Sequence, residues 1–483
     1  MKRNVKIQRQ RKIFSKKLVY LVCFLCISFL VFANTKYNIK HINWTHMDTN
    51  IRTSSIDSPA IVWSKAWGGA GVDHAYGLAL DSSDNIYVVG DTNSTSFSSL
   101  SISQPPPQTI SDIFLLKYTS LGQLEWARTW GGVEDDWGKS LVTDSSDNIF
   151  IVGTTRSFGA GGTDIALIKY NSLGVKQWNT TWGTSNSDSG YAIALDSSDN
   201  IFIAGTISTF NPPPDTIDMV LVKFNSLGEY QWNQTWGGGH IDSGWAMIMD
   251  SSDNIFITGF TYSYGAGGAD LFITKYNSQG TLQWDTTWGG SSFEDAHTIE
   301  LDSSGNIFVS GETSSFGAGS TDISLVKFNS NGDLQWNKTW GGSDSEGGWD
   351  LLALDSSENI YLAGGTKSFG TGIHDGFLVK YNNMGQQEWN TTWGGGGDDG
   401  FSSIIVDSSD NIYVAGYTDS YGSGMNDVAL IKYGESIPSN GPEGIPPAIP
   451  LELIIIIASV IGGGAVIAVA IVLLIRKKRR KLT

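Results

Sequence analysis

The chain has 483 residues, 40% of them hydrophobic, and a formal net charge of −17. Its two cysteines, Cys23 and Cys26, lie in an apolar N-terminal segment, which excludes a disulfide scaffold, a thiolate metal site or a cysteine nucleophile in the rest of the chain. Outside two basic ends, 17 basic residues face 48 acidic ones, a balance of about −31 that would repel nucleic acid.

The two ends of the chain predict a membrane protein. Residues 1–33 have a basic leader and a short apolar run, which predicts a signal peptide or, alternatively, an uncleaved N-terminal anchor. Residues 34–60 are expected to be a flexible lead-in. Residues 453–475 are uncharged and long enough to cross a bilayer as a helix, and residues 476–483 form a basic tail that should stay in the cytoplasm. The Pro/Gly-rich residues 434–450 before this helix would be a stalk. The middle part of the chain should therefore face outward from the cell membrane, held by a single-pass anchor.

Residues 61–433 repeat a unit of four predicted strands. The turn "DSSDN", with the variants "DSSGN" and "DSSEN" in two copies, recurs seven times between the first two strands, mostly at intervals of 52 to 54 residues. Its first Asp falls at Asp81, Asp144, Asp196, Asp250, Asp302, Asp355 and Asp407. The second strand resembles "NIYVVG", the third "DIFLLKY" and the fourth "LEWARTWGG". A four-strand unit of this length indicates an all-β, seven-bladed β-propeller with four-stranded blades.

The phase of the repeat predicts how the ring closes. The fourth strand follows the third in only six units, and its seventh copy, residues 61–69, stands alone before the first turn. We therefore expect this N-terminal strand to complete the last blade, since an open stack would expose a strand edge. The turn, the third strand and the "W-x3-W-GG" strand together resemble the SBBP repeat, a family named for a seven-bladed β-propeller, which implies this fold but says little about activity.

Residues that recur in every unit are interpreted as structural. The paired tryptophans could stack on sugars, but seven identical pairs favour packing between blades: Trp63/Trp67, Trp126/Trp130, Trp178/Trp182, Trp232/Trp236, Trp284/Trp288, Trp336/Trp340 and Trp389/Trp393. The third strand always carries an Asp and, five residues later, a paired or snorkelling Lys. The "DSSDN" turn has too few oxygens for an EF-hand-like calcium loop and predicts an Asx-type turn.

One set of acids suggests a binding site. Six residues after the second Trp of each pair lies an acid, and we call these seven the rim acids: Asp73, Asp136, Asp188, Asp242, Glu294, Glu346 and Asp399. Variable aromatic residues follow them, namely Trp137, Tyr191, Trp245, His297 and Trp349. If they converge near the axis, the rim acids could bind a metal, calcium above all, or a polyhydroxy ligand stacked on the rings. The alternative is that they cap turns and keep the rim solvated.

Asn-x-Ser/Thr acceptors predict N-glycosylation of an outward-facing domain, although four of them also match the strand consensus "W-N-x-T-W". They are Asn43, Asn93, Asn179, Asn233, Asn337 and Asn390.

Two classes of function remain open from the sequence. The first is a non-catalytic binding or scaffolding module on the cell surface, with an extracellular glycan, protein or cation as ligand and the membrane contacted through the C-terminal helix. The alternative is a propeller enzyme that acts on glycans or resembles quinoproteins. No nucleophile triad or metal-ligand spacing is evident, no cofactor is indicated beyond calcium, and uniform acids argue against an acid–base pair, which needs two different environments.

Overall fold

A computed structural model describes residues 58–94, 110–209, 216–348 and 352–434. These residues form strands and turns, and no helix among them is long and apolar enough to span a bilayer. The predicted segment 1–33, helix 453–475 and tail 476–483 lie outside the described residues, as do nearly all of the lead-in and the stalk.

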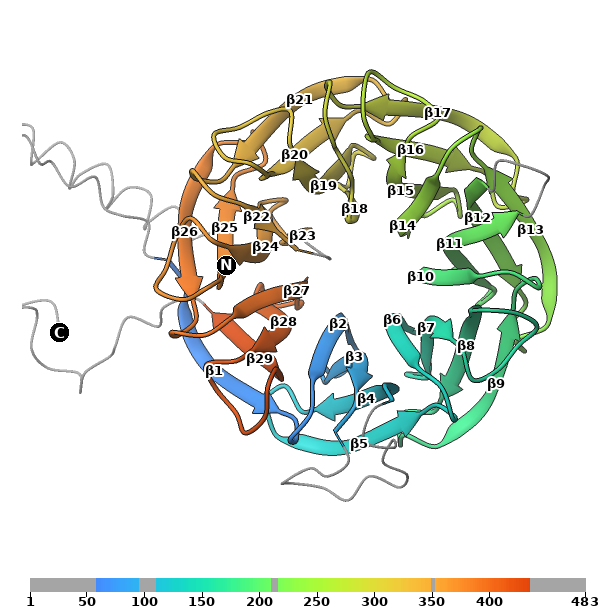
Figure 1. Cartoon of the computed structure of the whole chain (residues 1–483), viewed down its shortest axis with the longest axis horizontal. Helices are drawn as coiled ribbons and strands as arrows, with labels where there is room; N and C mark the ends of the chain where they lie inside the picture. Colours follow the sequence, from blue (N-terminus) through green and yellow to red (C-terminus); the bar gives the residue numbers. More distant parts are fainter. Residues whose placement is uncertain (1–57, 95–109, 210–215, 349–351, 435–483) are drawn as a thin grey trace, which may run out of the picture. The chain divides into compact units, whose positions relative to one another are not determined.

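Seven antiparallel sheets form the blades of a β-propeller, which confirms the predicted fold (Figure 1). Blade 1 contains β2 (Asp73–Leu80), β3 (Ile86–Thr92), β4 (Asp112–Tyr118) and β5 (Leu124–Trp130); blade 2 contains β6 (Asp136–Thr143), β7 (Ile149–Thr155), β8 (Asp164–Tyr170) and β9 (Lys176–Trp182). Blade 3 contains β10 (Asp188–Leu195), β11 (Ile201–Thr209), β12 (Thr216–Phe224) and β13 (Tyr230–Trp236); blade 4 contains β14 (Asp242–Met249), β15 (Ile255–Thr261), β16 (Asp270–Tyr276) and β17 (Leu282–Trp288).

The remaining blades follow the same order, and in blade 6 two short strands, β22 and β23, pair with β24. Blade 5 contains β18 (Thr298–Leu301), β19 (Ile307–Thr313), β20 (Asp322–Phe328) and β21 (Leu334–Trp340). Blade 6 contains β22 (Glu346–Gly347), β23 (Leu352–Leu354), β24 (Ile360–Thr366), β25 (Asp375–Tyr381) and β26 (Gln387–Trp393). Blade 7 contains β27 (Asp399–Val406), β28 (Ile412–Thr418), β29 (Asp427–Gly434) and β1 (Ala60–Trp67).

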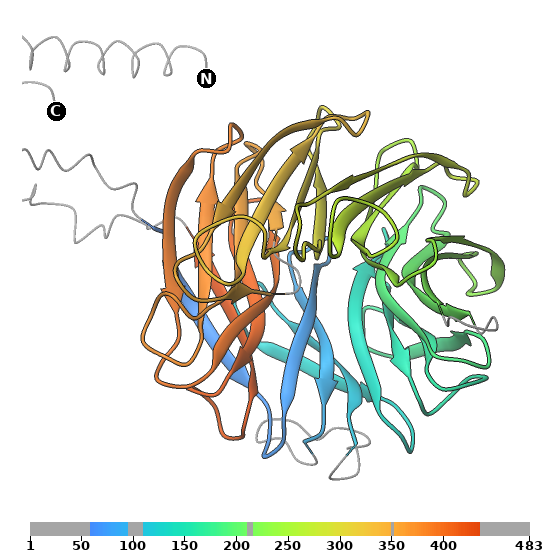
Figure 2. The same cartoon turned by 45° about the horizontal axis from the view of Figure 1, so that its top comes forward.

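The N-terminal strand closes the ring as predicted. β1 is the outer strand of blade 7 and pairs antiparallel with β29, with Trp63 opposite Lys432 and Trp67 opposite Val428. The first and last described strands, blue and red in Figure 1, therefore lie side by side in one sheet. In the tilted view of Figure 2 the strands of each blade run between the two faces of the ring.

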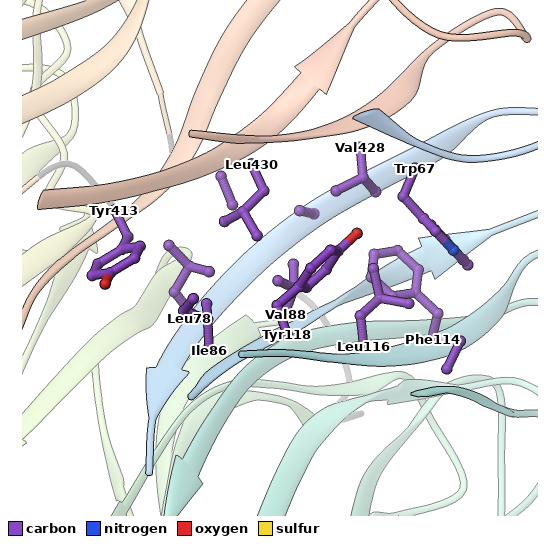
Figure 3. Close-up of a cluster of buried hydrophobic side chains, with 13 residues drawn as sticks. Trp67, Leu78, Ile86, Val88, Phe114, Leu116, Tyr118, Tyr413, Val428 and Leu430 are labelled. Carbon is purple, nitrogen blue, oxygen red and sulfur yellow. The ribbon is translucent and has the colours of Figure 1, made fainter. Parts of the chain in front are cut away.

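Apolar side chains fill the junction between each pair of neighbouring blades. At the closing junction, Trp67 of blade 7 packs on Phe114 of blade 1, with ring centroids 5.0 Å apart. Figure 3 shows this cluster, in which Leu78, Ile86, Val88, Leu116, Tyr118, Tyr413, Val428 and Leu430 are also buried. Trp236 packs in the same way on Phe272 of the next blade, at 4.4 Å. The tryptophans are thus used for packing between blades, as the sequence suggested.

A glycine in the turn between the third and fourth strands lets the preceding blade approach. Gly122 has a φ of 75°, and a Cβ there would lie 2.8 Å from the ring of Trp63 in the preceding blade. Glycine therefore meets both the left-handed backbone and the close approach.

The "DSSDN" turn is an Asx-type turn supported by the third-strand lysine. Asp81 Oδ1 accepts hydrogen bonds from the backbone N–H groups of Ser83 and Asn85, at 3.0 and 2.9 Å. Lys117 Nζ lies 3.4 Å from Asp81 Oδ2 and 5.2 Å from the centroid of the Tyr87 ring. The structure therefore confirms the predicted Asx-type turn and the predicted pairing of the third-strand lysine, and both contacts lie within one blade.

Replacing Trp67 by Ala tests whether the closing junction is as strong as an internal one. Because Trp67 is 4% exposed and Trp130 is 7% exposed, each truncation should lower the free energy of unfolding by a similar amount, about 3–5 kcal/mol. Urea unfolding of Trp67→Ala and Trp130→Ala would measure both, with the exposed Ser64→Ala on β1 as control. A much smaller loss for Trp67→Ala would mean that the ring does not depend on β1.

Candidate functional site

The rim acids lie where the chain enters the inner strands. Five of them begin β2, β6, β10, β14 and β27, Glu346 begins β22, and Glu294 forms an isolated bridge with Thr313. All seven are buried, at 0 to 1% exposure. Their carboxylates are therefore enclosed within the blades and are not open to solvent at the rim.

Each rim acid joins the first strand of its blade to the second. Asp136 Oδ1 accepts a hydrogen bond from the Thr155 hydroxyl, while its Oδ2 accepts from Gly132 N at 2.9 Å and from the Ser157 hydroxyl at 2.8 Å. Asp242 repeats this arrangement with Thr261, Gly238 and Ser263. No group of three or more acidic, His or Cys side chains within the described ranges is placed to hold a metal. Calcium binding by the rim acids stays a prediction.

The variable side chains are placed by a β-bulge in the inner strand. In blade 1, Ala75 pairs with Gly90 and Gly77 pairs with Val89, so Tyr76 is an extra residue without a partner in the ladder. The same shift occurs three residues after the rim acid in blades 2, 3, 4 and 7. Bulges re-aim a side chain locally and are frequent next to binding sites. We call the residues at this position the bulge ring: Tyr76, Lys139, Tyr191, Trp245, His297 and Ser402. Trp349 would be the seventh but lies outside the described residues.

Four members of the bulge ring line a central cavity. The cavity has a volume of about 480 Å³ and is lined by Tyr76, Lys139, Tyr191 and Trp245 together with the inner strands β2, β6, β10, β14 and β18. The three aromatic side chains are half-buried, and the Tyr191 and Trp245 rings meet edge-on at 6.4 Å. Aromatic surface and one ammonium group are therefore gathered on one side of the axis.

A buried acid and the cavity lysine modify each other. Burial raises the pKa of Asp91 to about 6, while the charge of Lys139 and a hydrogen bond from Tyr76 oppose the rise. Burial also lowers the pKa of Lys139, and Asp91 opposes that shift. Lys139 Nζ lies 4.1 Å from the centroid of the Tyr76 ring, so its charge is held between a ring face and an acid.

A second titratable cluster lies beside Trp245. The His297 ring packs on Trp245 at 4.7 Å, and its Nε2 lies 3.1 Å from Asp295 Oδ2. The backbone N–H of Glu312 donates to Asp295 Oδ1 at 2.8 Å. Burial raises the pKa of the Glu312 carboxyl, Asp295 raises it further, and His297 opposes the rise. The described inner strands next to this cluster are short, namely β18 of blade 5 and β22 and β23 of blade 6.

The sequence identified part of this site. It singled out Tyr191, Trp245 and His297, which the structure brings together, and Trp137, which instead packs on Arg156 at 5.1 Å from the ring centroid. It did not identify Tyr76, Lys139, Asp91 or Glu312. These residues could have been recognised from the sequence, because their positions vary between units within strands that are otherwise repetitive.

Comparisons with known proteins support the propeller repeat. A family described as a beta-propeller repeat, SBBP, matches residues 62–98, and a beta-propeller domain of unknown function matches residues 303–334. An uncharacterized WD repeat-containing protein of Acanthamoeba polyphaga mimivirus is 24% identical over 339 residues, which cover 50% of this chain and 24% of the relative. Regulatory protein FlaEY of Caulobacter vibrioides is 23% identical over 356 residues, which cover 67% and 34%. The chain thus spans about a third or less of the length of these relatives.

Solved propellers also resemble the structure. The WD40 domain of Neurospora crassa Pan2 has a TM-score of 0.45 at 8% identity, covering 80% of this chain and 99% of that one. A polysaccharide lyase, an ulvan lyase, has a TM-score of 0.44 at 13% identity, covering 76% and 96%. These similarities are too weak to inform the function of this chain.

The glycosylation acceptors within the described ranges lie on outer strands, apart from Asn93. Asn179, Asn337 and Asn390 are exposed. Asn233 is half-buried and accepts a hydrogen bond from the Tyr230 hydroxyl, and Asn93 Oδ1 accepts from Val72 N at 2.7 Å. Asn43 lies outside the described residues.

Exposure predicts which acceptors would carry glycans. We expect occupancy at Asn179, Asn337 and Asn390 in protein secreted by a glycosylating host, and little at Asn93, whose side chain is engaged. Intact-mass analysis before and after deglycosylation, with each acceptor changed to Gln, measures this. An unchanged mass would favour the strand consensus.

Asp91 should titrate near pH 6 if the cavity is built as described. Carbon-13 NMR of the Asp carboxyls should show a midpoint near pH 6 that disappears in Asp91→Asn. In Lys139→Met the midpoint should move higher, because the opposing positive charge is gone. Lys176→Met on outer strand β9 is the control and should leave it in place. A midpoint near 4 would contradict the enclosed environment.

Proposed function

We propose that the propeller is a non-catalytic binding module whose ligand, a glycan, occupies the central cavity against the bulge ring. The observation that carries this proposal is the presence of Tyr76, Tyr191 and Trp245 on successive or nearby inner strands, half-buried and lining one cavity. Half-buried aromatic rings offer an apolar face that sugar rings can stack on, with polar edges left for hydroxyl groups.

The division between repeated and unique residues supports this position for the site. The repeated Trp, Lys and Asp residues are used within and between blades, as in the Trp67–Phe114 and Lys117–Asp81 contacts. The bulge ring uses the same backbone device but different side chains in each blade. Recognition requires an asymmetric set of groups, and within the described blades such a set is found here.

The cellular setting is part of the same proposal. We propose that residues 453–475 anchor the protein in the cell membrane, that the basic tail stays in the cytoplasm and that the propeller meets extracellular glycans or proteins. The acidic charge balance of the chain outside its basic ends supports a soluble outer domain.

A second candidate function is glycan cleavage, favoured by one observation. Asp295 is buried and Glu312 is half-buried, so the two acids have different environments. Burial raises the pKa of the Glu312 carboxyl, so that it retains its proton to higher pH. A general acid for glycoside hydrolysis needs this property. Product formation from a bound oligosaccharide, lost in Glu312→Gln, would favour this function over binding alone.

Glycan binding can be tested on the purified full chain. Immobilised neutral and acidic oligosaccharides would identify a ligand, and quenching of tryptophan fluorescence would give its Kd. Trp245→Ala and Tyr191→Ala should each weaken binding about tenfold or more, the loss of roughly 1.4 kcal/mol of stacking. Trp137→Ala, a half-buried tryptophan on β6 outside the cavity lining, is the matched control and should bind normally. Equal losses in all three variants, or no binding by the wild type, would reject the proposal.

A further inference from the structure

A second acid accompanies each rim acid, and it is buried in every case except Asp218, which is half-buried. It is the first Asp of the third strand in the preceding blade, which enters the junction from the other side. We call these seven couples the acid pairs: Asp427/Asp73, Asp112/Asp136, Asp164/Asp188, Asp218/Asp242, Asp270/Glu294, Asp322/Glu346 and Asp375/Asp399. Every junction of the ring, including the closing one, contains one pair.

A glycine keeps the two carboxyl groups of a pair facing the same small space. At Gly131, a Cβ would collide with Asp112 Oδ1 and lie 2.8 Å from Asp136 Oδ2. The first glycine of "WGG", or its single glycine in "TWGT", stands between the two acids in the same way at all seven junctions: Gly68, Gly131, Gly183, Gly237, Gly289, Gly341 and Gly394. Any side chain there would fill the space, so the fold preserves the approach of two acids.

The hydrogen bonds of the pair leave one oxygen without a donor. The rim acid uses both oxygens, as described for Asp136. In blade 2, Asp164 Oδ2 accepts from Ala160 N and Gly161 N at 3.0 and 3.2 Å. The Oδ1 atoms of Asp112, Asp164 and Asp218 are buried and have no hydrogen-bond partner among the described residues. An unsatisfied buried oxygen next to a second carboxylate is costly, and a charge on both groups costs more.

We propose that the pairs Asp112/Asp136, Asp164/Asp188 and Asp218/Asp242 each hold one proton, carried by the unpaired Oδ1 and shared with the carboxylate of the rim acid, at neutral pH. The proton turns an orphaned acceptor into a donor and removes one of two like charges. Calcium would need six to eight oxygens, whereas a pair has only four carboxylate oxygens, and the two of the rim acid already accept hydrogen bonds. The site therefore suits a proton.

The surroundings of the pairs agree with this assignment. Burial, and then the charges of Asp136 and Asp135, raise the pKa of Asp112 to about 7. Arg128 of β5 and Lys176 of β9 line the adjoining cavity of about 440 Å³. Burial, and then the charge of the partner, also raises the pKa of Asp164 and of Asp218. A carboxyl whose pKa is raised by folding binds its proton more tightly in the folded state. Its stabilisation is present below the unfolded pKa of about 4 and is lost as pH rises towards 7.

The proposal can be tested by unfolding the full chain at several pH values. The melting temperature of the wild type should fall between pH 5 and pH 8. A variant with Asp112→Asn, Asp164→Asn and Asp218→Asn carries a permanent N–H donor in place of each proton, so its melting temperature should fall less over this range. Glu134→Gln, an exposed acid on the connection before Asp136, is the control and should keep the wild-type slope. Parallel curves for all three proteins would overturn the proposal.

Two further measurements test the proposal if the triple variant does not fold. Infrared spectroscopy of the wild type at pH 7 should show the carbonyl stretch of buried protonated carboxyls, which should be weaker in the single variant Asp112→Asn; its absence from the wild type would overturn the proposal. Calorimetry with calcium chloride should show no uptake that Asp112→Asn or Asp164→Asn removes. Calcium uptake lost in these variants would show that the pairs hold a metal instead.

Discussion

The pairing of β1 with β29 is the interaction on which the rest of the structure depends. It joins two strands from opposite ends of the described chain into one sheet and provides the outer strand that blade 7 would otherwise lack. Because Trp67 then packs on Phe114, the closing junction has the same aromatic core as the internal ones. A closed ring in turn holds the inner strands of blades 1 to 5 around one cavity, so the position of the candidate site follows from closure.

Each junction combines two kinds of contact. Tryptophans and the apolar second and third strands exclude water from the blade interface. An acid pair is unusual in such an interface because carboxyl groups are normally solvated. Buried carboxyls are tolerated where donors or protons compensate them. The rim acids meet this requirement with Thr, Ser and Gly donors. Five of the third-strand acids accept hydrogen bonds from loop N–H groups, and we propose a proton for Asp112, Asp164 and Asp218.

The ring also separates packing from recognition. Residues that every blade needs are repeated, so their roles could be inferred by counting, and the structure confirms the Asx-type turn and the Lys117–Asp81 contact. The bulge position uses the same backbone in several blades but carries tyrosine, lysine, tryptophan or serine. The fold thus provides a fixed frame on which a few side chains can vary without a cost to the blades.

By itself the sequence determined the seven blades, their four strands and the closing role of residues 61–69, because a four-strand unit repeated seven times, with one fourth strand standing alone before the first turn, allows one ring. It placed acids and aromatic residues near the entrance of each inner strand. Only the tertiary structure decided that the rim acids are enclosed and that Tyr76 and Lys139 reach the cavity. It also decided that Asp112 meets Asp136 across Gly131. The physical reason is that a one-residue bulge and contacts between neighbouring blades join residues whose relation has no local signal in the chain.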